Sequence, residues 1–269
     1  MWKILRARMH QGSRTIPFPS ESPTLPDRFR GLPALDASRC PDGCRACVAA
    51  CPTQALSIED GQLRMDLGRC LFCSDCVEAC PEGAIELGRD WRMATRRRQD
   101  LILDEGALRL AEALDARSRR IFGRSLKLRQ VSAGGCGACE ADVNVLGTVV
   151  FDLARFGIQF VASPRHADGL LITGAVSENM RVALAKTYAA VPEPKLVVAV
   201  GACAISGGPY AGHPEVLNGA EAVVPVDLFV PGCPPHPITI LDGLLRLLGR
   251  VAADSTQMGV TPDRSSTAR

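Results

Sequence analysis

The chain of 269 residues has few aromatic side chains, few lysines and no long hydrophobic run. No apolar stretch reaches the roughly 18 residues of a membrane-spanning helix. The first residues, Met1 to Arg8, contain no apolar core of a secretory signal peptide. Lysine supplies only four of the 31 basic residues, which we interpret as codon bias of a GC-rich genome. These absences predict a cytosolic protein, in which cysteines stay reduced.

Cysteine, by contrast, is abundant. The chain has twelve cysteines, and in a reducing compartment they indicate metal or catalytic sites rather than disulfides. Eight of them lie within residues 40–80 and form an internal repeat. Each half is a run of cysteines ending in Cys-Pro, followed by a short predicted helix and a short predicted strand. A unit of this size cannot bury a core alone, so we expect metal clusters to hold it together.

The repeat has the spacing of an iron–sulfur run, C-x2-C-x2-C-x3-C-P, whose fourth cysteine ligates the other cluster. This rule assigns the ligands of two clusters crosswise. The first cluster takes Cys40, Cys44, Cys47 and Cys80, and the second takes Cys70, Cys73, Cys76 and Cys51. Zinc is the alternative, because C-x2-C pairs also build zinc ribbons. Zinc does not explain two interleaved quartets that each end in Cys-Pro.

The first run departs from this pattern at one place. Three residues, Pro41, Asp42 and Gly43, separate its first two cysteines, where the pattern has two. We expect Gly43 to absorb the extra residue in a turn, since glycine adopts left-handed backbone conformations without steric cost. The alternatives are loss of the first ligand and a changed cluster type.

From residue 125 onward, predicted strands alternate with predicted helices, which indicates a parallel sheet covered on both faces. The expected strands are 125–131, 158–162, 169–173, 195–200 and 222–230, and the expected helices are 141–156, 177–191 and 238–251. Apolar residues at helical spacing predict a connecting helix over 100–120. No groove-reading motif accompanies the arginines beside it, so we expect no nucleic-acid partner.

Four further cysteines come directly after three of the predicted strands. They are Cys136, Cys139, Cys203 and Cys233. Because ligands bind outside the carboxyl ends of parallel strands, we expect the four thiols to converge and hold one cubane cluster. Flanking glycines would let the backbone approach the cluster and donate N–H groups to its sulfurs; the candidates are Gly135, Gly201 and Gly232. Four unrelated buried thiols are the alternative.

The first hundred residues resemble two-cluster ferredoxin subunits, and more narrowly the ferredoxin-like subunit of formate hydrogenlyase. The likeness rests on the double cysteine run and on the segments Met1–Leu5, Arg28–Pro33 and Gly68–Cys73. It implies an α+β ferredoxin-like domain that holds two [4Fe-4S] clusters.

The segment from Ser125 to Val251 resembles the small subunit of [NiFe] hydrogenases and the homologous subunit of respiratory complex I. The motifs that carry this likeness are Cys136-Gly-Ala-Cys139-Glu140, Gly201-Ala-Cys203 and Pro231-Gly-Cys233-Pro-Pro235. Two residues separate the first two of these cysteines, as in hydrogenases, whereas the complex I subunits have adjacent cysteines. The resemblance implies an α/β flavodoxin-like domain. It also implies a natural fusion of two subunits of the group 4, complex-I-like hydrogenases.

The function implied is that of the electron-transfer subunit of a membrane-associated [NiFe] hydrogenase, an oxidoreductase. Three [4Fe-4S] clusters would relay electrons between a large subunit, which holds the NiFe centre, and an outside redox partner such as formate dehydrogenase or ferredoxin. Membrane-arm subunits are further expected partners. Glu140 either relays protons toward the nickel or stabilises the first turn of the following helix. The alternatives are a complex-I-like quinone oxidoreductase subunit without nickel chemistry and a free-standing ferredoxin-type carrier.

The expected organisation has five segments. They are a docking segment at 1–30, a two-cluster ferredoxin domain at 31–88, an arginine-rich helical connector at 89–124, a proximal-cluster domain at 125–252 and a disordered tail at 253–269. The expected location is cytoplasmic and peripheral, on the inner face of the cell membrane.

We expect His236 to be a surface residue rather than a ligand, because four cysteines already fill the third cluster.

Overall fold

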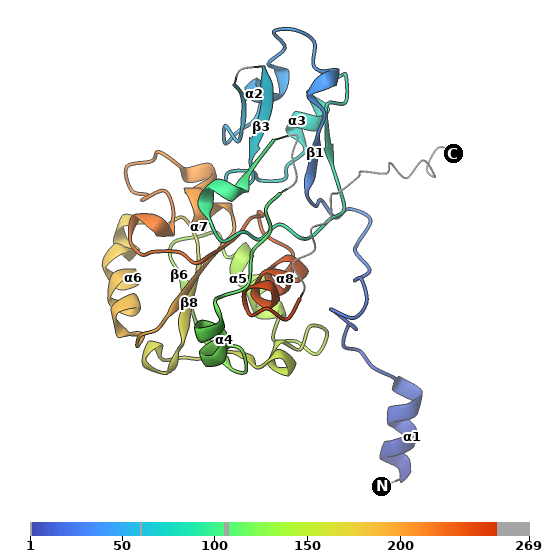
Figure 1. The fold of residues 1–269 in the computed structure, drawn as a ribbon, viewed down its shortest axis with the longest axis vertical. Coiled ribbons are helices and arrows are strands. Elements are labelled where there is room, and N and C mark those ends of the chain that lie inside the picture. Colours follow the sequence, from blue (N-terminus) through green and yellow to red (C-terminus); the bar gives the residue numbers. More distant parts are fainter. Residues whose placement is uncertain (1, 60, 105–107, 252–269) are drawn as a thin grey trace.

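The computed structural model describes residues 2–59, 61–104 and 108–251. The predicted disordered tail, 253–269, lies outside the described residues. Figure 1 shows a small cysteine-rich part resting on a larger α/β part, with the N-terminal helix at the opposite end of the molecule. Within the described ranges, no helix is both long enough and apolar enough to cross a membrane.

The secondary structure alternates between short strands and short helices. The helices are α1 (Trp2–Gln11), α2 (Ala46–Ala50), α3 (Asp75–Glu78), α4 (Ala116–Phe122), α5 (Ala138–Val145), α6 (Glu178–Ala190), α7 (Ala202–Ser206) and α8 (Pro237–Leu247). The strands are β1 (Pro33–Leu35), β2 (Leu56–Glu59), β3 (Gln62–Asp66), β4 (Ile85–Leu87), β5 (Ile102–Leu103), β6 (Leu126–Ser132), β7 (Ile158–Phe160), β8 (Gly169–Thr173), β9 (Leu196–Val200) and β10 (Leu228–Val230). The 3-10 helices are η1 (Ala37–Arg39), η2 (Arg98–Leu101), η3 (Leu153–Phe156), η4 (Pro164–His166), η5 (Gly208–Tyr210) and η6 (Ala220–Ala222).

The α/β part is built on a parallel sheet of five strands in the order β7-β6-β8-β9-β10. Counted along the chain within this part, the order is 2-1-3-4-5, which is that of flavodoxin-like sheets. Every residue of the central strands β8 and β9 is buried, as expected of strands covered on both faces. The predicted parallel sheet is therefore confirmed.

The two largest differences from the predicted elements of this part concern α5 and β10. Helix α5 ends at Val145 instead of Phe156, because Thr148 turns back and donates both its N–H and its hydroxyl to the Val145 carbonyl. The strand expected over 222–230 is confined to β10, since η6 occupies its beginning. Ser177 does precede α6, but its side chain makes no capping hydrogen bond.

The predicted connecting helix over 100–120 is wrong for most of the residues described there (100–104 and 108–120), because among them only α4 and the end of η2 are helical. Four of its apolar residues are buried by separate tertiary contacts; they are Leu101, Leu103, Ala111 and Leu114. Residues 102–103 pair with β3, and the N–H of Leu114 bonds to the carbonyl of Leu247 in α8. Thr95 exchanges two hydrogen bonds with Phe229, so the connector covers the β10 edge of the sheet. These tertiary contacts, and not the helical spacing of the apolar residues, determine the conformation of this segment.

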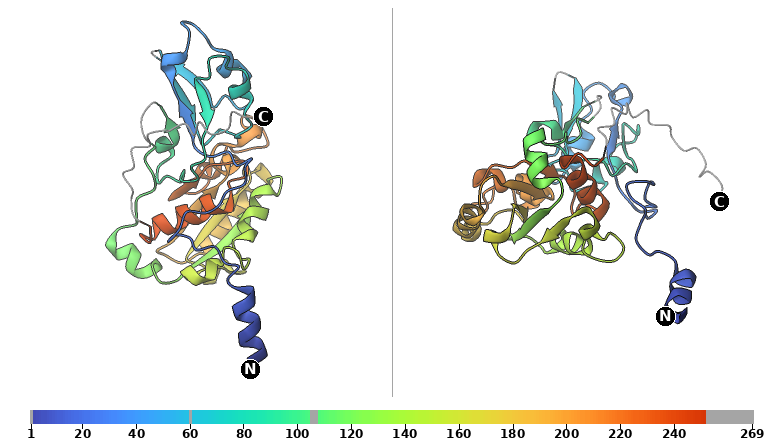
Figure 2. Two further views of the ribbon diagram at one scale, coloured as in Figure 1. Left: turned by 90° about the vertical axis from the view of Figure 1, so that its right-hand side faces the viewer. Right: turned by 60° about the horizontal axis from the view of Figure 1, so that its bottom comes forward.

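The cysteine-rich part contains two small antiparallel sheets, β1-β4 and β2-β3-β5. In each half of the repeat a short helix leads to a strand, α2 to β2 and α3 to β4, as predicted. One hydrophobic cluster joins this part to the α/β part, because Met65 and Leu67 belong to the same cluster as Ile205 and Phe229. Both views in Figure 2 show the two parts in direct contact.

Candidate metal centres

The first thiol quartet gathers around the turn between η1 and α2. Burial raises the pKa of the Cys40 thiol, and the charges of Cys80 and Cys44 raise it further. The pKa of Cys47 is raised chiefly by burial and then by Cys40 and Cys80. Such mutual effects require the groups to be neighbours. Cys80, from the second run, is thus brought beside the first run, as the crossed pattern predicts.

The extra residue in the first run is accommodated in a turn. Gly43 has a φ of +75°, in the left-handed region, and a side chain placed there would meet no atom within 4 Å. The N–H of Cys44 bonds back to the carbonyl of Pro41 at 3.0 Å, which closes the turn. Cys44 therefore stays beside Cys40 despite the insertion.

The second quartet lines one cavity. The walls of that cavity include Cys51, Cys70, Cys73 and Cys76. Burial, together with the charges of the other three thiols, raises the pKa of Cys70 to about 12. Burial and the charges of Cys73 and Cys51 raise the pKa of Cys76 to about 11. Metal loading would have to displace protons from these thiols, since the thiolate is the ligand.

The two halves of the repeat present their crossing cysteines in the same way. The N–H of Ala55 donates to Cys51 Sγ at 3.2 Å, and the N–H of Ala84 donates to Cys80 Sγ at 3.3 Å. In both halves the donor lies four residues after the cysteine. Backbone N–H donors to ligand sulfurs are among the features that set cluster potentials.

The third quartet lies at the carboxyl ends of β6, β9 and β10. The pKa of Cys139 is raised to about 12 by burial, then by Cys203 and Cys233, with smaller contributions from Glu140 and Cys136. Cys139 and Cys203 are buried, whereas Cys136 and Cys233 are exposed. The sheet thus brings together four cysteines that are up to 97 residues apart in sequence, from 136 to 233.

Glycines leave the space that the third quartet occupies. A Cβ on Gly201 would stand 2.5 Å from Cys139 Sγ, and a Cβ on Gly208 would stand 2.9 Å from Cys203 Sγ. The N–H of Gly201 bonds to the Val230 carbonyl and is not free for a cluster sulfur, so the expected donor role does not apply to this glycine. Gly208, the second glycine of the Ser206-Gly-Gly sequence that shares in the resemblance, was not among the candidate glycines predicted from the sequence.

The other two candidate glycines allow close contacts within the backbone. A Cβ on Gly135 would stand 2.9 Å from the Cα of Gly174. Gly232 has a φ of +145°, and a Cβ there would stand 2.4 Å from the Cα of Pro235. Both glycines therefore let the loops of the third quartet pack against neighbouring backbone.

The carboxylate of Glu140 is fixed at the ends of two strands. Its Oε1 accepts hydrogen bonds from the hydroxyls of Ser132 at 2.6 Å and Thr173 at 2.7 Å. Burial alone would raise the pKa of this carboxyl, but the two hydroxyl donors outweigh it and the pKa is lowered. Glu140 lies in the first turn of α5 and is held ionised beside the third quartet.

The second and third quartets face each other across the junction of the two parts. The charge of Cys73 contributes to the raised pKa of Cys233, after burial and Cys136. A cleft of about 760 Å³ opens beside them, lined by Phe72 from one side and Cys233 from the other. Arg30, on its rim, donates hydrogen bonds of 2.8 and 2.9 Å to the carbonyls of Phe72 and Cys73.

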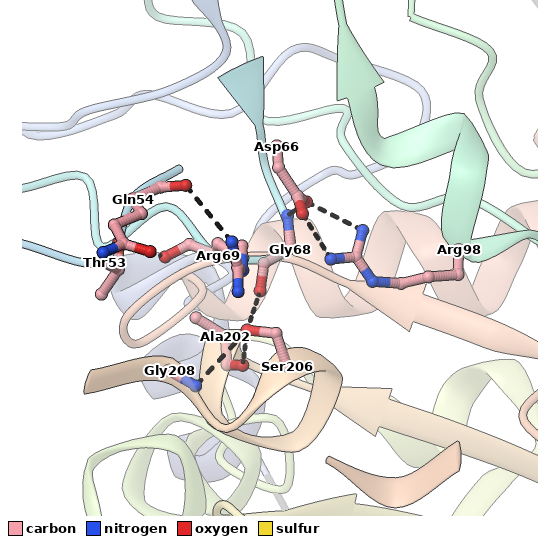
Figure 3. A network of polar contacts seen from close by, with 9 residues as sticks. All are labelled: Thr53, Gln54, Asp66, Gly68, Arg69, Arg98, Ala202, Ser206 and Gly208. Atoms are coloured by element: carbon pink, nitrogen blue, oxygen red, sulfur yellow. Dashed lines mark hydrogen bonds and ion pairs between the residues drawn. The ribbon is translucent and has the colours of Figure 1, made fainter. Parts of the chain in front are cut away.

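A polar network ties the same two quartets together (Figure 3). The hydroxyl of Ser206, in the helix that carries Cys203, donates to the carbonyl of Gly68 at 2.9 Å. The carboxylate of Asp66 accepts from the Gly68 N–H and pairs with Arg98. A Cβ on Gly68 would stand 2.7 Å from the side chain of Ile205, so the backbone packs directly on α7.

His236 is not the surface residue that the sequence analysis expected. Its Nδ1 accepts a hydrogen bond of 3.2 Å from the Ile238 N–H, which makes it the N-cap of α8. Its ring packs edge-on against Phe29, and burial lowers its pKa. His236 therefore serves the helix that follows it, and the four cysteines remain the candidate ligands of the third site.

The donor sets fit cubane clusters better than single ions. Over the parts of the chain that the structure describes, no three Cys, His, Asp or Glu side chains close around one metal-ion position. Four thiolates around zinc would converge on one ion, whereas a cubane takes each thiolate on a different iron. Each quartet offers the four thiolates that one cubane takes, one on each iron.

Comparisons with known proteins agree with this chemistry. Residues 39–88 match a 4Fe-4S dicluster domain. Residues 136–247 match the family described as NADH ubiquinone oxidoreductase, 20 Kd subunit. The resemblance of the first part to two-cluster iron–sulfur domains, and that of the second part to the complex I subunit, are thereby confirmed.

Three relatives show how far the likeness extends. An NADH-quinone oxidoreductase subunit of Heliobacterium modesticaldum is 42% identical over 120 residues, which are 44% of this chain and 69% of that protein. Probable membrane-bound hydrogenase subunit mbhJ of Pyrococcus furiosus is 38% identical over 133 residues, 49% of this chain and 80% of that protein. Formate hydrogenlyase subunit 7 of Escherichia coli is 43% identical over 126 residues, 47% of this chain and 49% of that protein. The chain belongs to the family of the NADH ubiquinone oxidoreductase 20 Kd subunit, and it carries a 4Fe-4S dicluster domain ahead of the segment that matches this family.

Proposed function

We propose that this chain is the electron-transfer subunit of a membrane-associated [NiFe] hydrogenase complex and relays electrons through three [4Fe-4S] clusters. The observation that carries the proposal is the grouping of all twelve cysteines into three neighbouring quartets. Each quartet has the donor number that one cubane needs. A fusion of a ferredoxin subunit (31–88) with a hydrogenase small subunit (125–252), joined by the connector 89–124, accounts for this arrangement.

The clusters would form a line with the second quartet in the middle. The charge of Cys73, in the second quartet, raises the pKa of Cys233, in the third. The two crossing cysteines, Cys51 and Cys80, each connect one cysteine run to the quartet of the other run. The cubanes supply one-electron redox steps when bound. The chain's own residues would hold them apart and set their order. Electrons would then pass from the third quartet through the second to the first, or in the reverse direction.

The third quartet is the one that we assign to the partner with the catalytic centre. Cys136 and Cys233 are exposed, so a large subunit can cover this corner of the molecule. By resemblance, that subunit would hold the NiFe centre. The first quartet would face the outside redox partner, a formate dehydrogenase or a ferredoxin. We further propose that the chain contacts membrane-arm subunits and lies on the cytoplasmic face of the cell membrane. The membrane-bound hydrogenase among the relatives supports this part of the proposal.

A complex-I-like quinone oxidoreductase subunit without nickel chemistry is the second candidate. It is supported by sequence identity, because the chain is 42% identical to the NADH-quinone oxidoreductase relative and 43% identical to the formate hydrogenlyase relative. The Cys136-x2-Cys139 spacing favours the hydrogenase branch by resemblance. Nickel content of the complex purified through this chain decides between them. A nickel-free complex that reduces quinone would overturn the hydrogenase assignment.

Cluster content tests the relay itself. The anaerobically purified chain is expected to hold about twelve irons and as many sulfides, in three sets of EPR signals after reduction. Cys51→Ser should remove the signal of the second cluster and spare the first, although Cys51 lies in the first run. Cys139→Ser should remove only the third signal. Fewer irons would contradict the three-cluster relay, and loss of the first cluster in Cys51→Ser would contradict the crossed assignment.

A further inference from the structure

We propose that the end of the molecule opposite the clusters is a docking surface for an anionic lipid bilayer. This surface consists of α1, the loop 146–152 and α4. The proposal does not depend on the redox function, because it concerns residues that contact none of the thiol quartets in the described structure.

The topology places these three elements at one edge of the sheet. Helix α5 begins near Cys136 at the carboxyl ends of the strands and runs back across the sheet, so the loop 146–152 after it lies at the amino edge. Helix α4 leads into the start of β6 and lies at the same edge. The segment after α1 is bound there too, since Ile16 N–H bonds to the Val150 carbonyl at 2.9 Å and the Thr15 hydroxyl bonds to the Val149 carbonyl at 2.7 Å. Figures 1 and 2 show α1 projecting beyond this end.

Helix α1 has the pattern of a helix that lies on a membrane surface. None of its residues is buried. Trp2, Leu5 and Met9 follow one another at i, i+3 and i+7 and form one stripe, of which Trp2 is 83% and Met9 75% exposed. Arg6 and Arg8 flank the stripe on its two sides. An aromatic and aliphatic stripe with basic flanks is typical of interfacial helices.

The neighbouring elements extend the same combination of apolar and basic groups. Val149 and Val150 are exposed beside the segment that follows α1, and Ile121 is exposed on α4. Four exposed arginines accompany Ile121; they are Arg117, Arg119, Arg120 and Arg124. A helix of ten residues binds lipid weakly alone, so these additional contacts matter for stable docking.

The positive charge of this surface indicates that its partner is an anionic bilayer. Four lysine or arginine residues and no acidic residue precede Glu21 in the sequence. Two acidic residues lie at this surface: Asp115, which caps α4 through the N–H groups of Arg117 and Ser118, and the half-buried Asp152 at the end of the loop 146–152. An apolar surface bordered by arginines in excess of acidic groups complements anionic headgroups, which attract each basic side chain near the bilayer surface. A protein partner that binds by apolar contacts alone would not need this charge.

Vesicle binding by the full, cluster-loaded chain tests the proposal. Vesicles with one part phosphatidylglycerol to two parts phosphatidylcholine should bind the chain in low salt and release it as salt rises. Arg6→Gln combined with Arg8→Gln should weaken partitioning roughly 25-fold, at about fivefold per charge. Leu5→Gln combined with Met9→Gln should weaken it at least about tenfold. These side chains are exposed, so the variants should fold normally.

Matched controls lie on α6, on a different side of the α/β part. Val182→Gln removes an equally exposed apolar side chain and Lys186→Gln an exposed charge, and both should bind as the unaltered chain does. Binding to pure phosphatidylcholine with equal strength would overturn the anionic requirement. Absence of vesicle binding, or equal losses in the α6 and α1 variants, would overturn the docking surface and leave a protein-binding face as the remaining use of α1.

Discussion

The hydroxyl of Ser206 donates a hydrogen bond of 2.9 Å to the carbonyl oxygen of Gly68. Ser206 lies three residues after Cys203 of the third quartet, and Gly68 lies two residues before Cys70 of the second. This single bond therefore joins the two loops that carry neighbouring quartets. It is one of the contacts that set their separation, and electron transfer between bound clusters would depend on that separation.

Ser206→Ala should loosen this junction without removing any ligand. The loss of one hydrogen bond should cost about 1 kcal/mol of stability. All three EPR signals should persist, while the magnetic coupling between the second and third clusters should weaken. Ser163→Ala, in the loop between β7 and β8, is the matched control. Unchanged coupling in Ser206→Ala would show that the apolar contacts around Ile205 hold the junction by themselves.

Gly201→Ala should destroy the third cluster selectively. The added Cβ would stand 2.5 Å from Cys139 Sγ, so the thiol has to leave its place. Iron content should fall from about twelve to about eight per chain, with both ferredoxin signals retained. Gly212→Ala is a close control, because Gly212 has a similar positive φ of +83° but no atom within 4 Å of the added Cβ. Equal iron loss in both variants would trace the effect to backbone strain instead.

Glu140→Gln should make the potential of the third cluster more positive. The ionised carboxylate acts electrostatically on Cys139 and Cys203, and a nearby negative charge opposes reduction of a cluster. The amide keeps a carbonyl oxygen for Ser132 and Thr173, so the fold should be preserved. Redox titration followed by EPR measures the shift. An unchanged potential, accompanied by loss of hydrogen turnover, would instead support a proton relay through Glu140.

Stability should decrease as the pH falls through the ordinary pKa range of histidine. Burial lowers the pKa of His236 in the folded chain below its usual 6.5, so near that pH the unfolded state binds more protons. The stabilisation is complete above this range and is lost as the unfolded state becomes protonated. Protonation of Nδ1 would also remove the capping hydrogen bond that Nδ1 accepts from the Ile238 N–H.

His236→Asn tests this linkage, because asparagine caps helices and does not titrate. Anaerobic thermal melting between about pH 8 and pH 6 should show a smaller loss of melting temperature in the variant than in the unaltered chain. His166→Asn, at the end of η4, is the control. The same pH dependence in the unaltered chain and in His236→Asn would assign the effect to other groups.

The candidate cluster sites of this protein could be proposed from the order of its residues alone. Cysteine spacing is a local property, so two interleaved quartets could be inferred from residues 40–80. The parallel sheet followed from the alternation of strands and helices. The convergence of Cys136, Cys139, Cys203 and Cys233 was predictable because parallel strands end at one edge.

How the parts meet depends on contacts between distant segments. The periodic leucines of 100–120 predicted a helix, but pairing with β3 and contacts with α8 spread this segment across the sheet edge instead. The contact between Ser206 and Gly68 joins positions 138 residues apart, and no local pattern encodes it. The same holds for the edge that gathers α1, α4 and the loop 146–152. Spacing along the chain predicts which cysteines belong to one quartet, whereas packing between distant segments decides how the quartets are arranged and which surfaces are left for partners.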